Sequence, residues 1–269
     1  MSTRLHNINE IIRIGDEDTE FIERNKEYFC SGGWLKKQNG AYDEVLNKTF
    51  GSFFYFSRTG TIQELFKKID DSALEPNIKC YAKKRFKNTR AAWLDESFIT
   101  TYNGFKENPD DFGDWDFECQ DIQFDLKSSV LPKDFGNYRT SMDIISNSEQ
   151  FIRDMFFESS KYNRANPECH KQSNRFFMIY YSKKDKNYFN SYDRINTEFL
   201  KLNYKAKRKI FDEVFREFDK NIHVFNLKDV EYYYYDKIHK YKEVNCVICL
   251  VGEQENGEIK HYLVKKIKN

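Results

Sequence analysis

Residues 113–129 read GDWDFECQDIQFDLKSS, and this stretch decides the fold prediction. Apolar and polar residues alternate twice within it, first over 115–119 and then over 122–126. Alternation with a period of two is typical of strands that are buried on one face only. The stretch therefore predicts a β-hairpin with one apolar face and one polar face.

The same alternation predicts how the two strands pair. If the connection is Gln120-Asp121, Phe117 faces Phe124 and both apolar rows fall on one side of the hairpin. A slip of one residue would mix apolar and charged side chains on both faces. The pattern therefore favours this pairing, even though Gln-Asp is not a preferred sequence for a two-residue turn.

The polar face of the hairpin carries the candidate chemistry. The predicted register sets Asp116 directly opposite Asp125, with Lys127 on the same face. Opposed side chains lie ~5 Å apart, and like charges at that distance destabilise a sheet. A bound divalent cation would compensate for the repulsion. The alternative is an ordinary solvated hairpin face, the usual meaning of such alternation.

Composition limits the class of protein. The chain has 269 residues, of which 39% are hydrophobic and 17% aromatic, so it can bury a sizeable core. The formal net charge is +1, which means that an anionic partner must be held by local clusters. No apolar run is long enough for a membrane span, and the N-terminal residues do not resemble a secretory signal. Six scattered cysteines fit reduced thiols. These features predict a cytoplasmic location and no membrane partner.

Helical and strand-like patterns surround the hairpin. A long helix is predicted over 79–104 before it, and a helix over 148–157 and an apolar strand over 175–182 after it. No linker rich in Pro, Gly or Ser divides the chain, so one α/β domain with an N-terminal elaboration is predicted. Further helices are expected over 19–29, 61–69 and 196–219, and strand-like segments over 51–57, 223–227, 231–236, 244–252 and 259–266.

The hairpin and its surroundings resemble the core of the PD-(D/E)XK nuclease superfamily, to which many restriction endonucleases belong. The signature of that superfamily is an acid on one strand and an acid-x-Lys triplet on the next. Asp116 matches the first acid, and Asp125-Leu126-Lys127 matches the triplet. The superfamily's proline before the first acid is absent, because Trp115 stands there, and this leaves Asp114 as the alternative first acid.

The resemblance covers residues 79–184 and implies a restriction endonuclease-like core of helix, mixed β-sheet and helix. Residues 1–78 are then an N-terminal elaboration of unknown function, and 79–269 form the nuclease-like domain with a C-terminal elaboration. A second acid-x-Lys triplet, 258–260, has no acid on a paired strand upstream and no similar order of elements around it. It serves as an internal control for chance matches.

The resemblance also implies the activity, a divalent-metal-dependent endonuclease that hydrolyses DNA phosphodiester bonds, of bacterial or phage restriction or defence. The cofactor would be Mg²⁺, with Mn²⁺ as a substitute, because magnesium prefers oxygen ligands. Asp116, Asp125 and the Leu126 carbonyl would bind the metal, and Lys127 would orient or deprotonate the attacking water. In some families of the superfamily a glutamate on the preceding helix joins the metal site.

The glutamate on the preceding helix would be Glu96 in this sequence, with its neighbour Asp95 as the alternative, since periodicity does not separate them.

Lys133 and Arg139, in the loop after the triplet, are the predicted contacts to DNA phosphates. Duplex DNA is the expected partner, and cutting both strands commonly requires two active sites, which would call for a homodimer. Two alternatives stay open: an RNA-directed nuclease, and a non-catalytic module that binds nucleic acid or a partner on the same fold.

Overall fold

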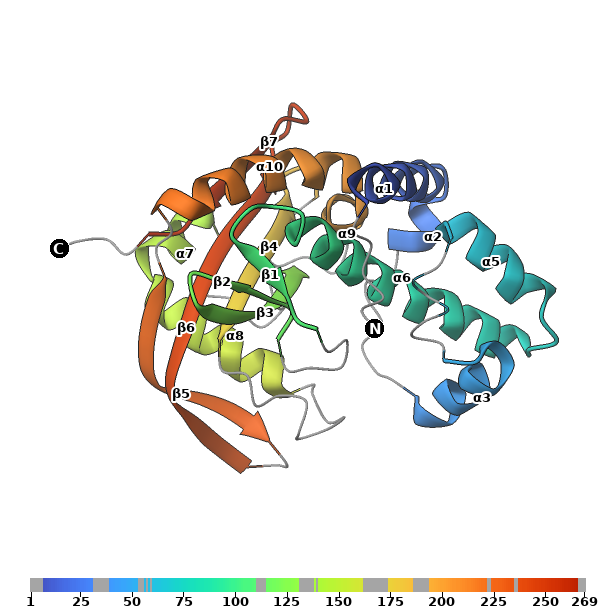
Figure 1. Ribbon diagram of the computed structural model, residues 1–269, viewed down its shortest axis with the longest axis horizontal. Helices are drawn as coiled ribbons and strands as arrows, with labels where there is room; N and C mark the ends of the chain where they lie inside the picture. The colour runs from blue at the N-terminus through green and yellow to red at the C-terminus, as the bar shows by residue number, and fades with distance from the viewer. Residues whose placement is uncertain are drawn as a thin grey trace.

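Helices and one mixed β-sheet make up the protein, as the computed structural model in Figure 1 shows. The structure describes residues 7–30, 39–52, 56, 58, 60–109, 115–130, 138, 140–161, 174–185, 194–221, 224–234 and 237–265. The helices are α1 (Ile8–Arg24), α2 (Lys26–Cys30), α3 (Gly40–Phe50), α5 (Ile62–Asp71), α6 (Pro76–Ile99), α7 (Ser141–Ser146), α8 (Ser148–Lys161), α9 (Ile195–Leu202) and α10 (Tyr204–Asn221). The strands are β1 (Phe105–Glu107), β2 (Phe117–Cys119), β3 (Ile122–Val130), β4 (Arg175–Ser182), β5 (Phe225–Tyr234), β6 (Lys237–Glu253) and β7 (Ile259–Leu263).

The strands form one sheet in the order β1-β2-β3-β4-β6-β5. In addition, β7 pairs with the C-terminal residues of β6, 249–253. The three strands β1, β2 and β3 are antiparallel neighbours, whereas β3, β4 and β6 run parallel. Two parallel neighbours need a crossover connection. The chain makes that crossover between β3 and β4 through α7 and α8.

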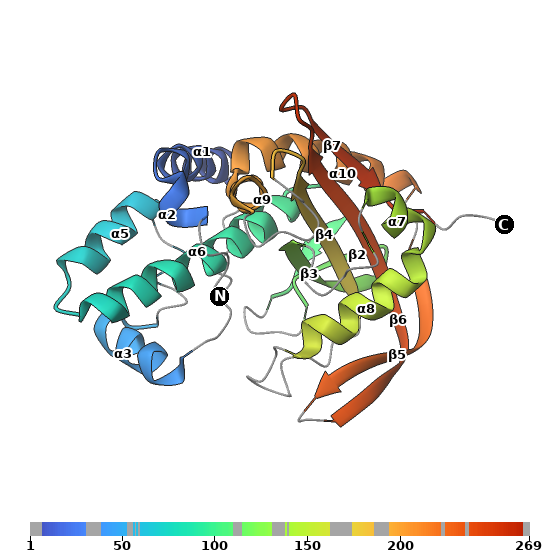
Figure 2. The same cartoon turned by 180° about the vertical axis from the view of Figure 1, so that it is seen from behind.

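The sheet is covered on both faces. Phe176 and Met178 of β4 belong to a core that also contains residues of α6, α9 and α10. Phe177 and Ile179, which point the other way, pack with residues of α7 and α8. Figure 2 shows α8 lying along this second face. Every residue of β4 is buried, which explains why its sequence reads as a continuous apolar run.

The N-terminal helices form a third core on the first half of α6. Phe86 of α6 lies in this helical core, whereas Trp93, two turns further on, lies in the core of the sheet. Ile11 and Ile14 of α1 also reach the core of the sheet. The two cores therefore share α6. The predicted boundary at residue 78 stays a prediction, and it falls within the first turn of this shared helix.

The predicted hairpin is confirmed, including its turn. Phe117 pairs with Phe124, and the connection is Gln120-Asp121. Both turn residues have positive φ, 52° and 60°. This is the backbone of a type I′ turn, whose twist matches that of the flanking strands. Two residues without the preferred Asn-Gly sequence adopt it because the apolar pairing fixes the register.

Most other predicted elements are found, with changes at their ends. The helices over 79–104 and 148–157 are α6 and α8, and the strand over 175–182 is β4. The single helix expected over 196–219 is wrong, because it breaks at Asn203 into α9 and α10. The Asn203 side chain accepts a hydrogen bond from the Ala206 backbone N–H at 3.0 Å, as a residue at the start of a new helix does.

Other differences concern short or merged elements. Residues 225–227 and 231–234 of the two expected strand-like segments belong to one strand, β5, and the helix over 19–29 is divided between α1 and α2. The short elements β1, α3 and α7 were not expected. Of the segment over 51–57, residues 53–55 and 57 lie outside the described residues, and Phe56 is helical.

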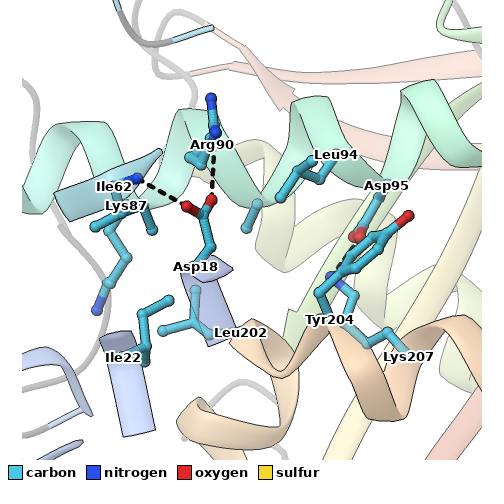
Figure 3. Close-up of a pocket in the computed structure, with 11 residues that line it drawn as sticks. Asp18, Ile22, Ile62, Lys87, Arg90, Leu94, Asp95, Leu202, Tyr204 and Lys207 are labelled. Carbon is cyan, nitrogen blue, oxygen red and sulfur yellow. Dashed lines mark hydrogen bonds and ion pairs between the residues drawn. The ribbon is translucent and has the colours of Figure 1, made fainter. Parts of the chain in front are cut away.

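Two buried ion pairs join α6 to other helices, one to α1 and one to α10 (Figure 3). Asp18 of α1 accepts hydrogen bonds from the Ile62 backbone N–H at 2.7 Å and from Arg90 Nε at 2.9 Å. Asp95 of α6 pairs with Lys207 of α10. A cavity of ≈ 10 Å³ lies between the two pairs, about the smallest size that holds one water molecule.

None of the described helices is long and apolar enough to cross a membrane.

Candidate active site

Asp116 lies immediately before β2, at a β-bulge. Its backbone N–H donates to the Phe124 carbonyl at 2.9 Å, and Phe124 is also the ladder partner of Phe117. Two consecutive residues thus face a single residue of β3, which is the definition of a bulge. The predicted position of Asp116, directly opposite Asp125, is therefore corrected: the regular ladder ends at Phe117, and the bulge turns the Asp116 side chain.

The turned carboxylate replaces a backbone acceptor. Leu126 N–H, which would meet the Trp115 carbonyl if the ladder continued, donates to Asp116 Oδ2 at 2.7 Å. The Trp115 carbonyl accepts instead from the Asn108 side-chain amide at 2.7 Å. Asp116 is thereby bound to the backbone of β3 within the Asp125-Leu126-Lys127 triplet.

Asp125 is held between two cations. Lys127 Nζ lies 2.7 Å from its Oδ1, and Arg175 Nη1 lies 2.9 Å from its Oδ2. Burial acts to raise the pKa of Asp125, but the charges of Arg175 and then Lys127 outweigh it and hold the pKa below its ordinary value. Asp125 is therefore ionised at neutral pH.

Asp116 shows the opposite behaviour. Its enclosure raises its pKa well above the ordinary value, and the negative charges of Glu96 and then Asp125 raise it further. A hydrogen bond between the two aspartate side chains favours the ionised form of Asp125. The two carboxyl groups titrate as a pair, in which Asp116 retains the proton and Asp125 carries the charge.

The structure separates the two acids of α6 that periodicity left equivalent. Glu96 is 9% exposed, and its charge is the largest electrostatic influence on Asp116, so it belongs to the aspartate cluster. Asp95 is fully buried and pairs with Lys207, and it accepts a hydrogen bond from Ser128 Oγ at 3.0 Å. Asp95 therefore links β3 with α6 and α10 and does not belong to the cluster of Asp116, Asp125 and Glu96.

The donor set suits a hard divalent cation. Asp116, Asp125 and Glu96 offer carboxylate oxygens, and the Leu126 carbonyl adds a neutral oxygen, which is the chemistry that Mg²⁺ prefers. Among the residues that the structure describes, however, no group of three or more His, Cys, Asp or Glu side chains is already gathered to hold a metal. Both oxygens of Asp125 are bound to side-chain cations instead.

Arg175 is the site residue that sequence reasoning undervalued. The sequence analysis names Lys133 and Arg139 as the basic residues that contact phosphate, whereas the structure brings Arg175 into contact with Asp125. The contact arises because Asp125 and Arg175 are register partners on the parallel strands β3 and β4. A charged residue directly before the apolar and aromatic run 176–181 is the sequence signal that points to Arg175 as a site residue.

Three predicted site residues, Asp114, Lys133 and Arg139, lie outside the described residues. The control triplet is found on the surface, where Lys260 Nζ and Glu258 Oε2 form an exposed ion pair at 3.2 Å.

Comparisons of the chain with protein-family models, with curated proteins and with solved structures find no match.

Proposed function

We propose that this protein is a divalent-metal-dependent nuclease that hydrolyses DNA phosphodiester bonds at the cluster of Asp116, Asp125 and Lys127. The observation that carries the proposal is the joining of these three residues with Glu96 in one place. The residues come from α6, from the position immediately before β2 and from β3, in the order of the superfamily signature. The parallel pairing of β3 with β4 through α8 is also consistent with a restriction endonuclease-like core.

Hydrolysis of a phosphodiester needs an attacking water and relief of the negative charge that builds up on the phosphate. A bound Mg²⁺ would supply both, by polarising a water and by neutralising phosphate oxygens. Asp116, Asp125 and Glu96 would hold it, with the Leu126 carbonyl. Lys127, whose side chain is 36% exposed, reaches the solvent and would orient the attacking water.

The binding of DNA adds two residues to the proposal. Lys133 and Arg139 lie in the segment that follows β3 and are proposed to contact phosphates. Duplex DNA is the proposed substrate, and a homodimer is proposed because cutting both strands commonly requires two active sites.

The test is incubation of the purified protein with plasmid DNA and with RNA, in Mg²⁺ and in EDTA. Cleavage of DNA in Mg²⁺ alone is expected, and Asp125→Asn or Lys127→Ala should abolish it. The control variants Glu258→Gln and Lys260→Ala alter the second acid-x-Lys triplet and should cleave as the wild type does. Activity that survives in the first pair and disappears in the second would place the site elsewhere.

One observation favours a second candidate, a non-catalytic module that binds nucleic acid. Each oxygen of Asp125 already has a cationic partner, and Asp116 accepts a backbone hydrogen bond, so the cluster is stable as a structural unit. Retention of DNA or RNA without cleavage in Mg²⁺ or Mn²⁺ would support this candidate. Cleavage of RNA but not of DNA would identify an RNA-directed nuclease.

A further inference from the structure

Asp125 is bound by two cations that differ in their surroundings. Arg175 Nη1 holds Oδ2 at 2.9 Å, and Lys127 Nζ holds Oδ1 at 2.7 Å. The Lys127 side chain is 36% exposed, whereas only 7% of the Arg175 side chain is exposed. Lys127 can therefore move into solvent, but Arg175 is enclosed beside Asp125.

The backbone around Arg175 is fixed on both sides. The Asp125 N–H donates to the Asn174 carbonyl at 3.3 Å. The Asn174 side chain donates to the Gln123 carbonyl at 3.1 Å and accepts from the Asn245 N–H at 2.8 Å. These bonds hold the start of β4 between β3 and β6. Separation of the guanidinium from Asp125 therefore requires rotation of a side chain and no movement of the backbone.

The guanidinium has other partners within its reach. Nη1 also donates to the Asn174 carbonyl at 3.2 Å, and the Arg175 Cζ lies 5.9 Å from the centre of the Phe156 ring on α8. A guanidinium is stabilised over an aromatic ring, and more so where water is excluded. Arg175 therefore has a place to remain when it leaves the carboxylate.

We propose that Arg175 is an electrostatic latch on the candidate metal site. Its guanidinium holds Asp125 Oδ2 in the metal-free protein, and a divalent cation binds that oxygen only after the guanidinium has moved away. The inference rests on the proposed function, because it takes Asp125 as a metal ligand. The two cations compete for the same lone pairs and repel each other in a partly buried site, so Arg175 weakens metal binding by the free protein.

The latch suits a substrate that carries phosphate. A phosphate group accepts two parallel hydrogen bonds from a guanidinium, so it can take the place of Asp125 as the partner of Arg175. Metal and a phosphodiester strand would then each increase the affinity of the protein for the other. The cluster would load metal mainly when a strand is bound.

Metal affinity tests the latch directly. Binding of Mn²⁺ is measured from the electron paramagnetic resonance signal of the free ion, for the wild type, Arg175→Gln and Arg208→Gln. Arg208 is the matched control, because it forms a 3.5 Å ion pair with Asp16 that lies outside the cluster. Arg175→Gln is expected to bind Mn²⁺ at least ~10-fold more tightly than the wild type, since a nearby positive charge is removed. Arg208→Gln should match the wild type.

Two results would overturn the latch in different ways. Equal or weaker Mn²⁺ binding by Arg175→Gln would mean that Arg175 supports the metal site or is indifferent to it, and the nuclease proposal would stand. If the wild type and both variants bind no Mn²⁺, the nuclease proposal fails together with the latch.

A second measurement uses the wild type, in case Arg175→Gln does not fold. The Nε–H signal of Arg175 in a nitrogen-15 NMR spectrum is assigned by its absence from the spectrum of Arg175→Lys. Addition of Mg²⁺ is expected to shift this signal in step with metal binding. A signal that stays unchanged at saturating Mg²⁺ would show that the guanidinium does not move, and the latch would be rejected.

Discussion

At the scale of single residues, Asp116 and Asp125 have the same side chain and lie next to each other, yet their pKa values move in opposite directions. Asp125 has two cationic partners, Lys127 and Arg175, whereas Asp116 has a backbone amide and two acidic neighbours. The difference arises because burial, Glu96 and Asp125 raise the pKa of Asp116 more than the charge of Lys127 lowers it, whereas two cations contact Asp125 directly. A symmetric hairpin face would have left the two acids equivalent.

This asymmetry predicts different effects of two matched substitutions in EDTA at neutral pH. Asp116→Asn should melt at or above the temperature of the wild type, because an amide oxygen still accepts the Leu126 N–H bond and no acid is enclosed. Asp125→Asn should lose about 1–3 kcal/mol of stability, since Arg175 loses its charged partner and the Asn174 carbonyl and the Phe156 ring replace it only in part. Thermal melts followed by circular dichroism measure both effects. Equal shifts of the two variants would contradict the asymmetry.

The pH dependence of stability follows from the same pKa shifts. A raised pKa means that folded Asp116 binds more protons than the unfolded chain above pH 3.8, so its stabilising contribution is lost as the pH rises through the folded pKa. Asp125 has a lowered pKa, so its contribution is present above 3.8 and is lost as the pH falls through the folded pKa. Urea unfolding should therefore show the advantage of Asp116→Asn growing as the pH rises above about 4 towards the folded pKa of Asp116. A constant advantage would mean that Asp116 does not titrate in this range.

At the scale of elements, the turn of the hairpin stores strain that the sequence does not relieve. Gln120 and Asp121 both have positive φ, a conformation that costs ordinary residues about 1 kcal/mol or more each. Replacing the pair by Asn-Gly should stabilise the protein by about 1 kcal/mol, as measured by urea unfolding. Because the turn lies at the opposite end of the hairpin from Asp116, metal binding should not change. Destabilisation by Asn-Gly would mean that the turn side chains have partners that matter more than the strain.

The elements that sequence reasoning predicted are those that depend on local periodicity. The hairpin, α6, α8 and β4 each have a regular apolar pattern, and each is found. The break at Asn203 was missed because one polar residue inside a periodic segment resembles an ordinary exposed position. The partner of Asp125 could not be predicted, since Arg175 reaches it through parallel pairing across 50 positions of sequence. The bulge depends on hydrogen bonds that periodicity does not report.

At the scale of the whole molecule, α6 contributes residues to two cores. Asp18 and Arg90, which are 2% and 1% exposed, join α1 to the middle of that helix. Asp18→Ala leaves Arg90 buried without its carboxylate and should cost about 3–5 kcal/mol. The matched control Asp16→Ala removes a partly exposed pair and should cost about 1 kcal/mol or less.

The same coupling predicts a single unfolding transition. Urea curves of Asp18→Ala followed by far-ultraviolet circular dichroism and by tryptophan fluorescence should coincide, because the helical core and the core of the sheet share α6. Two separated transitions would show that the N-terminal helices unfold on their own. In that case residues 1–78 would be a separable unit.

The hydrogen bond from Leu126 N–H to Asp116 gives the protein a natural spectroscopic reporter. The amide lies where the regular ladder with β2 has ended, so its slow exchange with solvent would depend on a side chain. Its chemical shift would follow the proton on Asp116, and would change again when that carboxylate gains a new partner. A single backbone peak would therefore record the state of the cluster in the unmodified protein, before any substrate is known.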